Sequence, residues 1–361
     1  MDHSFEKRLD ALREEAKTTG QVHGAGVRAA GGPMPSATPT PEGMPGPGYY
    51  GLPVVKPPVW KWMIAVYFFV GGLAGMAALV AMAALEKGQF ELVRAAMWAA
   101  GLGGIVSPVL LTWDLGRPRR FINMLRVFKY QSPMSVGSWI VSAFGAFAVP
   151  GLGLIEWQWQ TLHGSSSNPT VHVLTSILVI GTGLTGIFLA TYTGALIAVT
   201  AVPAWNVHRL VLPFHFGMAG LGSAAGLLEL AGFRLPALNV IGFFAASAET
   251  LVLLWLELRK HGAVDQALHQ GKAGWTLRAG EALEGPIALV FRSLGLVYFA
   301  AAAFLLGALV TRFGWLWAGA ASAADPESVF ASQRGQARPA RAAMPYVLAS
   351  TGHSLAPDPE H

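Results

Sequence analysis

Long apolar runs separated by short polar loops occupy the chain from residue 60 onward. The hydrocarbon core of a bilayer is about 30 Å thick, so a helical crossing needs ~20 consecutive apolar residues. Seven runs reach that length with little or no charge: 60–85, 92–112, 136–155, 171–195, 210–231, 236–256 and 287–310. The pattern predicts an all-α polytopic membrane protein, a bundle of about seven transmembrane helices.

The fourth run leaves the number of crossings open. Its apolar stretch continues to Val202, which is too long for one upright helix, before Pro203 ends it. An eighth crossing by a short or broken helix is therefore the alternative. Two spans carry small residues at the spacing that lets helix backbones approach closely in lipid. These are Gly71 with Gly75 and Gly222 with Gly226.

The two ends of the chain differ from its middle. Residues 1–20 are expected to form an amphipathic helix and residues 21–58 a Gly/Pro-rich linker. The transmembrane domain is expected over 59–317, followed by a polar, loop-like tail over 318–361. No apolar signal-peptide core is found in the first 30 residues, so the first span is expected to direct insertion.

Composition restricts the chemistry further. With 53% hydrophobic and 12% charged residues, the chain has too little polar surface for a soluble globule of this size. It has no cysteine, which excludes disulfides, Cys-ligated zinc and iron–sulfur clusters bound by this chain, and we expect no metal site. No nucleotide-binding glycine motif is present in a suitable context.

The basic residues indicate an orientation. The sequence pI near 9.6 reflects Lys and Arg in short loops beside the spans, a pattern typical of topology signals rather than of nucleic-acid binding. With seven spans, most of the 25 Lys and Arg residues fall on the side of the N-terminus. The positive-inside rule then predicts a cytoplasmic N-terminus and a C-terminus on the opposite side.

The charged stretch "WDLGRPRRFINMLRVFKYQSPMSVGSW" over 113–139 separates two apolar spans. Its Asp114 ends the second span, where a carboxylate is either paired with a neighbouring Arg or faces a ligand and accepts a proton. Together with "WKWMIAVYFFVGGLAG", "TYTGALIAVTAVPAW" and "AGAASAADPESVF", the stretch resembles the NrfD/PsrC family, the membrane subunits of polysulfide-reductase-like complexes. The resemblance covers roughly residues 49 to 333.

The resemblance implies a role in electron transfer at a bacterial inner membrane. Members of this family exchange electrons between a quinone, either menaquinone or ubiquinone, and a ferredoxin-like iron–sulfur subunit. That subunit often connects them to a molybdopterin catalytic subunit, and the membrane subunit itself holds no haem. We therefore expect this chain to be the quinone-interacting subunit of such a complex.

Quinone chemistry moves two electrons and two protons, so its site needs an apolar slot with a few polar groups for the carbonyl oxygens. Asp114 matches the acid of the family motif and is the expected proton-transferring group. The resemblance and the loop geometry give the expected quinone-binding residues: Trp60, Lys61, Tyr67, Asp114, Arg117, Tyr130, Ser135 and Trp139. The tryptophans are equally suited to anchoring at the membrane interface.

Further ionisable residues lie within the spans. Glu249 lies deep in the sixth span, where an unpaired carboxylate is costly. It is therefore expected to face the bundle interior, either as a second proton-transferring residue or as a hydrogen-bonded structural acid. Glu229, His172 and His215 lie nearer span ends, where snorkelling or capping is expected.

Three other functions are compatible with parts of the pattern. A b-type cytochrome needs matched axial histidines, which the sequence does not supply on facing helices. A secondary transporter would suit the threonine-rich fourth run, but no inverted repeat is visible. A structural anchor without its own quinone site would need neither Asp114 nor Glu249.

Overall fold

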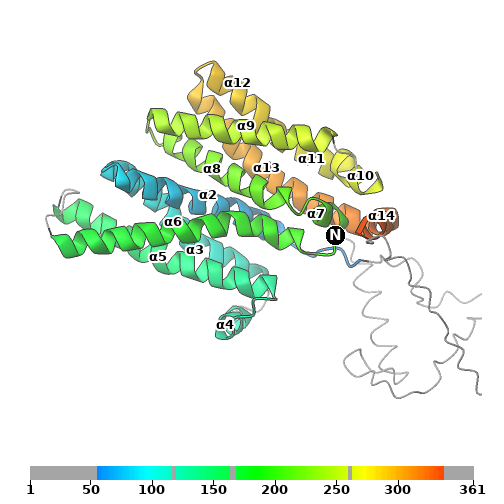
Figure 1. The fold of residues 1–361 in the computed structure, drawn as a ribbon, viewed down its shortest axis with the longest axis horizontal. Helices are drawn as coiled ribbons and strands as arrows, with labels where there is room; N and C mark the ends of the chain where they lie inside the picture. The colour runs from blue at the N-terminus through cyan, green and yellow to red at the C-terminus, as the bar shows by residue number, and fades with distance from the viewer. Residues whose placement is uncertain (1–54, 116–118, 163–167, 259–261, 337–361) are drawn as a thin grey trace, which may run out of the picture. The chain divides into compact units, whose positions relative to one another are not determined.

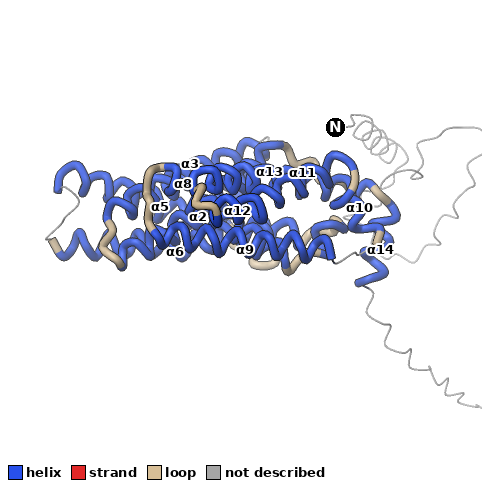
Figure 2. The backbone as a smooth tube through the Cα atoms, turned by 90° about the horizontal axis from the view of Figure 1, so that it is seen from above, coloured by secondary structure: helices blue, strands red, loops and turns tan. Residues whose placement is uncertain are grey.

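The computed structural model describes residues 55–115, 119–162, 168–258 and 262–336. The expected amphipathic helix over 1–20, most of the linker after it and the end of the polar tail lie outside these residues. All regular secondary structure in the described part of the chain is helical, as Figure 2 shows. This confirms the predicted all-α fold.

The helices follow one another in this order: α2 (Trp62–Glu86), α3 (Phe90–Asp114), α4 (Arg119–Arg126), α5 (Pro133–Leu162), α6 (Pro169–Ala198), α7 (Pro203–Val207), α8 (Val211–Leu230), α9 (Pro236–Leu258), α10 (Ala263–His269), α11 (Gly271–Ala282), the π-helical turn η1 (Leu283–Ile287), α12 (Ala288–Ser293), α13 (Val297–Ala324) and α14 (Pro326–Gln336).

The helices α2, α3, α5 and α6 form a first four-helix bundle, drawn in blue, cyan and green in Figure 1. Helix α2 packs against α3 and α6, and α5 closes the ring by contacting both. The bundle interior contains Met97, Phe144 and Ile155, none of which has exposed surface. Lipid tails are as apolar as these side chains, so the hydrophobic effect does not drive their burial within the membrane. Tight packing between the helices does.

A second four-helix bundle consists of α8, α9, the run from α11 through η1 to α12, and α13. Helix α13 packs along α11 and α12, while α8 contacts both α9 and α13. Helix α8 also packs against α2 and α6, and this contact joins the two bundles.

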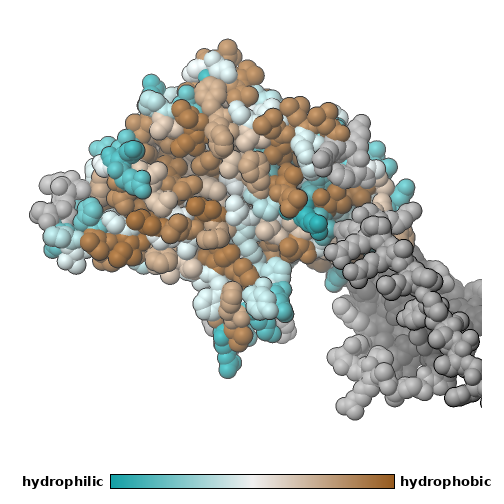
Figure 3. Space-filling view, in the orientation of Figure 1, coloured by the Kyte–Doolittle hydropathy of each residue, from teal (hydrophilic) through white to brown (hydrophobic). Residues whose placement is uncertain are grey.

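Seven helices in the described residues have the length and apolar composition of membrane spans: α2, α3, α5, α6, α8, α9 and α13. The first six cover the first six predicted runs, which are confirmed. The over-long fourth run resolves into α6, which ends at Ala198, and the short α7, which begins at Pro203. Figure 3 shows apolar residues over the flanks of these helices and a mixture of hydrophilic and apolar residues on the projecting α4.

The predicted seventh span, residues 287–310, overlaps the seventh candidate span, but its bounds are wrong. Helix α12 ends at Ser293 and α13 begins at Val297, with Gly295 between them at φ 75°, a backbone conformation that favours glycine. The apolar span is α13 itself. It continues beyond residue 317, where the loop-like tail was expected to begin, and the helix α14 follows it.

A further helical run crosses the second bundle beside α13. From Gly271 the backbone is helical without a break through α11, η1 and α12 to Ser293. At 1.5 Å per residue this run is long enough for the ~30 Å hydrocarbon core. It carries Arg278, Glu281 and Glu284 in its middle, which explains why apolarity alone did not reveal it. Within the described residues the bundles therefore contain, beside the seven apolar spans, an eighth helical run of spanning length.

An even number of crossings brings the chain back to the end of the bundles at which its first crossing began. Trp60, just before α2, stacks on Trp205 of α7 with ring centroids 5.2 Å apart. Helix α14 contacts α7 and α10, so it lies at the same end, which we call the Trp60 end. The opposite end, with the α12–α13 turn, is the Gly295 end. Up to Gln336, this arrangement contradicts the expectation that the chain's two ends lie on opposite sides.

Helix α14 is capped by Asp325. Its carboxylate accepts hydrogen bonds from the backbone N–H groups of Glu327 and Ser328, at 3.2 and 3.1 Å. The Ser328 hydroxyl donates a further bond, and together these donors hold the pKa of Asp325 below its ordinary value. The cap fixes α14 against α10 at the Trp60 end.

Glycines set the closest approaches between helices. A Cβ atom on Gly75 of α2 would overlap the backbone carbonyl of Gly186 in α6. A Cβ on Gly222 of α8 would overlap the ring of Phe304 in α13, and Gly226 meets the backbone of the same helix. The predicted packing role is therefore confirmed at Gly75, Gly222 and Gly226.

We predict that Gly75→Ala destabilises the folded protein by about 1–3 kcal/mol, because the new methyl group must push two backbones apart. The matched control is Gly153→Ala in α5, where a Cβ meets nothing within 4 Å. Thermal unfolding in detergent should show a lower Tm for Gly75→Ala and no loss for Gly153→Ala. Equal Tm values would contradict the close α2–α6 contact.

The eight crossings can be tested by labelling single cysteines, since the natural sequence has none. We predict that Lys129→Cys and Gln333→Cys react with a membrane-impermeant maleimide from the same side of the membrane. Lys87→Cys, in the α2–α3 turn, should react from the other side. All three side chains are exposed. Labelling of Lys129→Cys and Gln333→Cys from opposite sides would instead support seven crossings.

Candidate functional site

Asp114 lies at the Trp60 end of the first bundle as the last residue of α3, with its side chain partly buried. Its carboxylate accepts a hydrogen bond from the backbone of Lys61 and is attracted by the Lys61 ammonium group. Two of the predicted site residues are therefore neighbours. The third charged candidate, Arg117, lies outside the described residues.

Tyr67 lies one to two turns deeper in α2 and is 1% exposed. It lines a small cavity of about 30 Å³ together with Ser138 of α5 and Tyr192 of α6. The Tyr192 hydroxyl donates a hydrogen bond to the backbone carbonyl of Pro133. The remaining walls are apolar: Leu111, Leu115, Met124, Met134, Gly137 and Leu196. Since Leu115 directly follows Asp114, the cavity adjoins the Asp114–Lys61 contact.

The other predicted residues do not converge on this cavity. Trp60 turns toward the second bundle, where it stacks on Trp205. Ser135 braces the loop before α5, since its hydroxyl accepts from the Lys129 N–H at 3.1 Å. Tyr130 is 77% exposed, and Trp139 is exposed with its ring edge-on to Phe128. Tyr130 and Trp139 therefore lie on the outer surface, and Ser135 is buried against the loop, away from the cavity lining.

A second polar site, which the sequence only partly indicated, lies inside the second bundle. Each of its four helices contributes one ionisable residue: His215 from α8, Glu249 from α9, Glu284 from η1 and Arg312 from α13. All four side chains are at most 1% exposed. Glu249 therefore faces the bundle interior, as expected.

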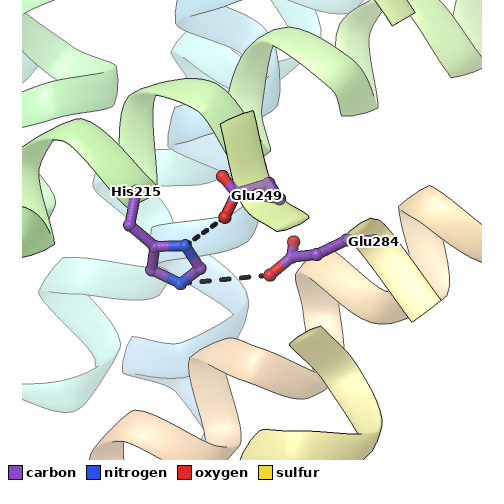
Figure 4. A group of neighbouring side chains, drawn as sticks. All are labelled: His215, Glu249 and Glu284. Carbon is purple, nitrogen blue, oxygen red and sulfur yellow. Dashed lines mark hydrogen bonds and ion pairs between the residues drawn. The ribbon is translucent and has the colours of Figure 1, made fainter. Parts of the chain in front are cut away.

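The imidazole of His215 lies between the two carboxylates, as Figure 4 shows. Its Nδ1 is 2.6 Å from Oε2 of Glu249, and its Nε2 is 3.9 Å from Oε1 of Glu284. Arg312 stacks on the ring of Phe216, with Cζ 3.8 Å from its centroid, and attracts both carboxylates. Its Nε and Nη1 atoms make no hydrogen bond to a described protein atom, which leaves donors for water.

The charges of this cluster set its chemistry. Two ionised carboxylates and one guanidinium would leave a net negative charge in a water-poor interior. The buried carboxylate of Glu281, which interacts with both Glu249 and Glu284, adds to that charge, and bound protons reduce it. The cluster is thus suited to hold one exchangeable proton shared between imidazole and carboxylates. Three of its donor atoms lie within 4.8 Å of one another, a spacing that would also suit a metal ion.

The orientation of His215 argues against a metal centre. Each ring nitrogen of His215 faces a different carboxylate, so the imidazole separates the two glutamates instead of joining them on one side. The neighbouring guanidinium of Arg312 would also repel a cation. A proton-sharing cluster, with one direct hydrogen bond between His215 and Glu249, fits the arrangement better than a metal site does.

Further charges are paired at both ends of the second bundle, in a buried pair at one end and a partly exposed pair at the other. At the Gly295 end, Arg292 donates to both carboxylate oxygens of Glu229, at 2.8 and 2.7 Å, and to the Asn239 side chain. At the Trp60 end, Arg278 pairs with Glu257 at 2.9 Å. The expectation that Glu229 and His215 snorkel toward water is therefore wrong, since both are buried among partners.

The sequence contains signals for two site residues that the predictions did not include, Arg312 and Glu284. Arg312 interrupts the apolar span "FLLGALVTRFGWLW", and an arginine in mid-span requires an internal partner. Glu284 belongs to "EGPI", where Pro286 removes a backbone donor and accompanies the π-helical turn η1. Turns of this kind are frequent at functional sites.

Comparison with known proteins agrees with the sequence motifs. The family model described as "Polysulphide reductase, NrfD" matches residues 54–322. The sequence is also 26% identical over 308 residues to the C subunit of polysulfide reductase from Wolinella succinogenes. That alignment covers 72% of this protein and 94% of the relative.

The buried pair at the Gly295 end should be structural. We predict that Glu229→Gln destabilises the protein by about 3–5 kcal/mol, because it leaves the buried Arg292 charge without its partner. The matched control is Glu156→Gln, which removes the partly exposed partner of Arg94 and should cost about 0–1 kcal/mol. Denaturant unfolding in detergent measures both. A cost for Glu229→Gln no larger than the control's would contradict this assignment.

Proposed function

Because the chain belongs to the polysulphide reductase NrfD family, we propose that it is the quinone-interacting membrane subunit of a respiratory oxidoreductase complex. In this role it exchanges electrons between the membrane quinone pool and a ferredoxin-like iron–sulfur subunit. The family match over residues 54–322 carries the proposal. The relative's name, which makes it the C subunit of polysulfide reductase, supports a place in a multi-subunit reductase.

The cavity beside Tyr67 is the proposed quinone site. Its apolar walls suit a quinone ring, and the Tyr67 hydroxyl can donate a hydrogen bond to a carbonyl oxygen. The hydroxyls of Ser138 and Tyr192 donate to the backbone carbonyls of Ser135 and Pro133, so each would have to turn to bind the quinone. At about 30 Å³ the cavity is smaller than the ring, so binding requires Met124 and Met134 to turn aside. Both are unbranched, flexible side chains that can do so.

Asp114 is the proposed proton-transferring residue of this site. It lies at the end of α3, where the cavity lining meets the aqueous boundary, and Lys61 holds its carboxylate in place. A carboxylate there can pass a proton between the interior and water. Quinone chemistry supplies the two-electron step, and this protein supplies the donors and the proton route.

Glu249 is the second proposed proton-transferring residue. With His215 and Glu284 it forms a cluster that can hold and release one proton inside the second bundle. The 2.6 Å contact between His215 and Glu249 allows a proton to pass directly between them. We assign the cluster to proton movement linked to electron transfer.

The Trp60 end is the proposed docking face for the iron–sulfur subunit. Its loop before α5 exposes Phe128, Lys129 and Tyr130, an aromatic and basic surface that suits an acidic partner. Of the protein's 25 Lys and Arg residues, the opposite end carries only Lys87, Arg94, Arg234 and the paired Arg292 in or beside its described connections. The positive-inside rule then orients the Trp60 end, with the N-terminus, toward the cytoplasm.

The experiment measures quinone turnover by the complex in its native membrane. We predict that Asp114→Asn and Glu249→Gln each lower turnover by about 100-fold or more, the usual cost of losing a positioned acid or base. Glu91→Gln, an exposed acid in the first turn of α3, is the matched control and should leave turnover unchanged.

A pull-down of the partner subunit separates chemistry from assembly. Asp114→Asn should retain the partner while losing turnover. Full turnover with the partner attached would make the protein an anchor without a quinone site at Asp114. Loss of the partner itself would assign Asp114 to assembly, and the quinone-site proposal for this residue would then fail.

A further inference from the structure

A pocket of about 550 Å³ opens at the Gly295 end of the second bundle, far along the helices from the proposed quinone site. It lies between the turn that joins α8 to α9 and the turn that joins α12 to α13. Its walls include the apolar side chains of Phe233, Leu235, Leu296 and Phe299. The pocket is large enough for the head and the first part of the tails of an amphipathic molecule.

The polar groups of this pocket leave one positive charge uncompensated. Glu229 lines the pocket, but both of its carboxylate oxygens already accept hydrogen bonds from Arg292. Arg234 also lines it and donates from Nε to the Tyr298 hydroxyl at 2.9 Å, with its guanidinium over the same ring. No carboxylate in the described part of the sequence forms an ion pair with Arg234. The pocket therefore attracts an anion.

The outer rim of the pocket is apolar and exposed. Phe299 is 63% exposed and Leu296 is 42% exposed, at the point where α13 begins. Such side chains at the end of a membrane span meet the boundary between lipid tails and headgroups. A ligand that carries hydrocarbon chains as well as negative charge therefore binds here more tightly than one that carries charge alone.

We propose that this pocket binds an anionic phospholipid. The lipid phosphate pairs with the guanidinium of Arg234, and the acyl chains lie along Leu296 and Phe299. Asn239 accepts from Arg292 through Oδ1 at 3.0 Å, which directs its amide donors to a ligand oxygen. A zwitterionic lipid is disfavoured because both Glu229 oxygens are occupied and no other acid in the pocket can meet an ammonium headgroup.

The test compares lipid binding by the purified full-length protein in detergent micelles. Phosphatidylglycerol and phosphatidylcholine with the same acyl chains are titrated, and bound lipid is counted by native mass spectrometry. Arg234→Gln removes the proposed phosphate ligand, and since Arg234 is exposed the fold should survive, which its Tm verifies. Lys87→Gln is the matched control, because it removes a positive charge at the same end of the molecule but outside the pocket.

We expect wild type and Lys87→Gln to bind phosphatidylglycerol about tenfold more tightly than phosphatidylcholine, and Arg234→Gln to bind both alike. Equal affinities in the wild type, or loss of the preference in Lys87→Gln, would overturn the proposal. Displacement of phosphatidylglycerol by inorganic phosphate alone would identify a small-anion site instead. Displacement by a short-chain neutral quinone would assign the pocket to a quinone. None of these readouts depends on quinone turnover.

Discussion

A charged side chain inside a membrane persists only where the protein itself neutralises it, and this constraint organises the second bundle. Arg278, Arg292 and Arg312 each meet carboxylates from a neighbouring helix. These pairs decide which helices lie side by side, because exchanging two helices would separate the charges. The first bundle follows a different rule, since its closest contacts are between glycines such as Gly75 and Gly186.

The sequence predicted those parts of the fold whose signal is local. Six apolar runs became six helices because length and apolarity are properties of single segments. The run from Gly271 to Ser293 escaped, since its charges are acceptable only beside partners that other helices supply. Because this run was missed, the last predicted span was placed across the turn at Gly295. For the same reason, the segment beyond α13 was expected at the end opposite to the one where it lies.

The candidate site was predictable to a similar extent. Asp114 and Lys61 do lie together, as the charged boundary residues of adjacent helices, and Tyr67 does point inward. Trp60 was misplaced because its partner, Trp205, is far away in the sequence and lies in α7, which packs against α13 of the other bundle. The same distance hid the residues around Glu249, whose contact with His215 spans 34 positions.

The turn at Gly295 has a consequence for how this protein enters a membrane. The helical run before it carries several charges near its centre, each costing about 2.5–3.5 kcal/mol to insert alone, so it does not partition into lipid unaided. The apolar α13 follows after a turn of only Leu294 to Leu296. During synthesis the two segments must therefore enter as one helical hairpin, after α8 and α9 are present to receive the charges. Biogenesis of the second bundle is thus ordered, with its most polar helix depending on the segment made after it.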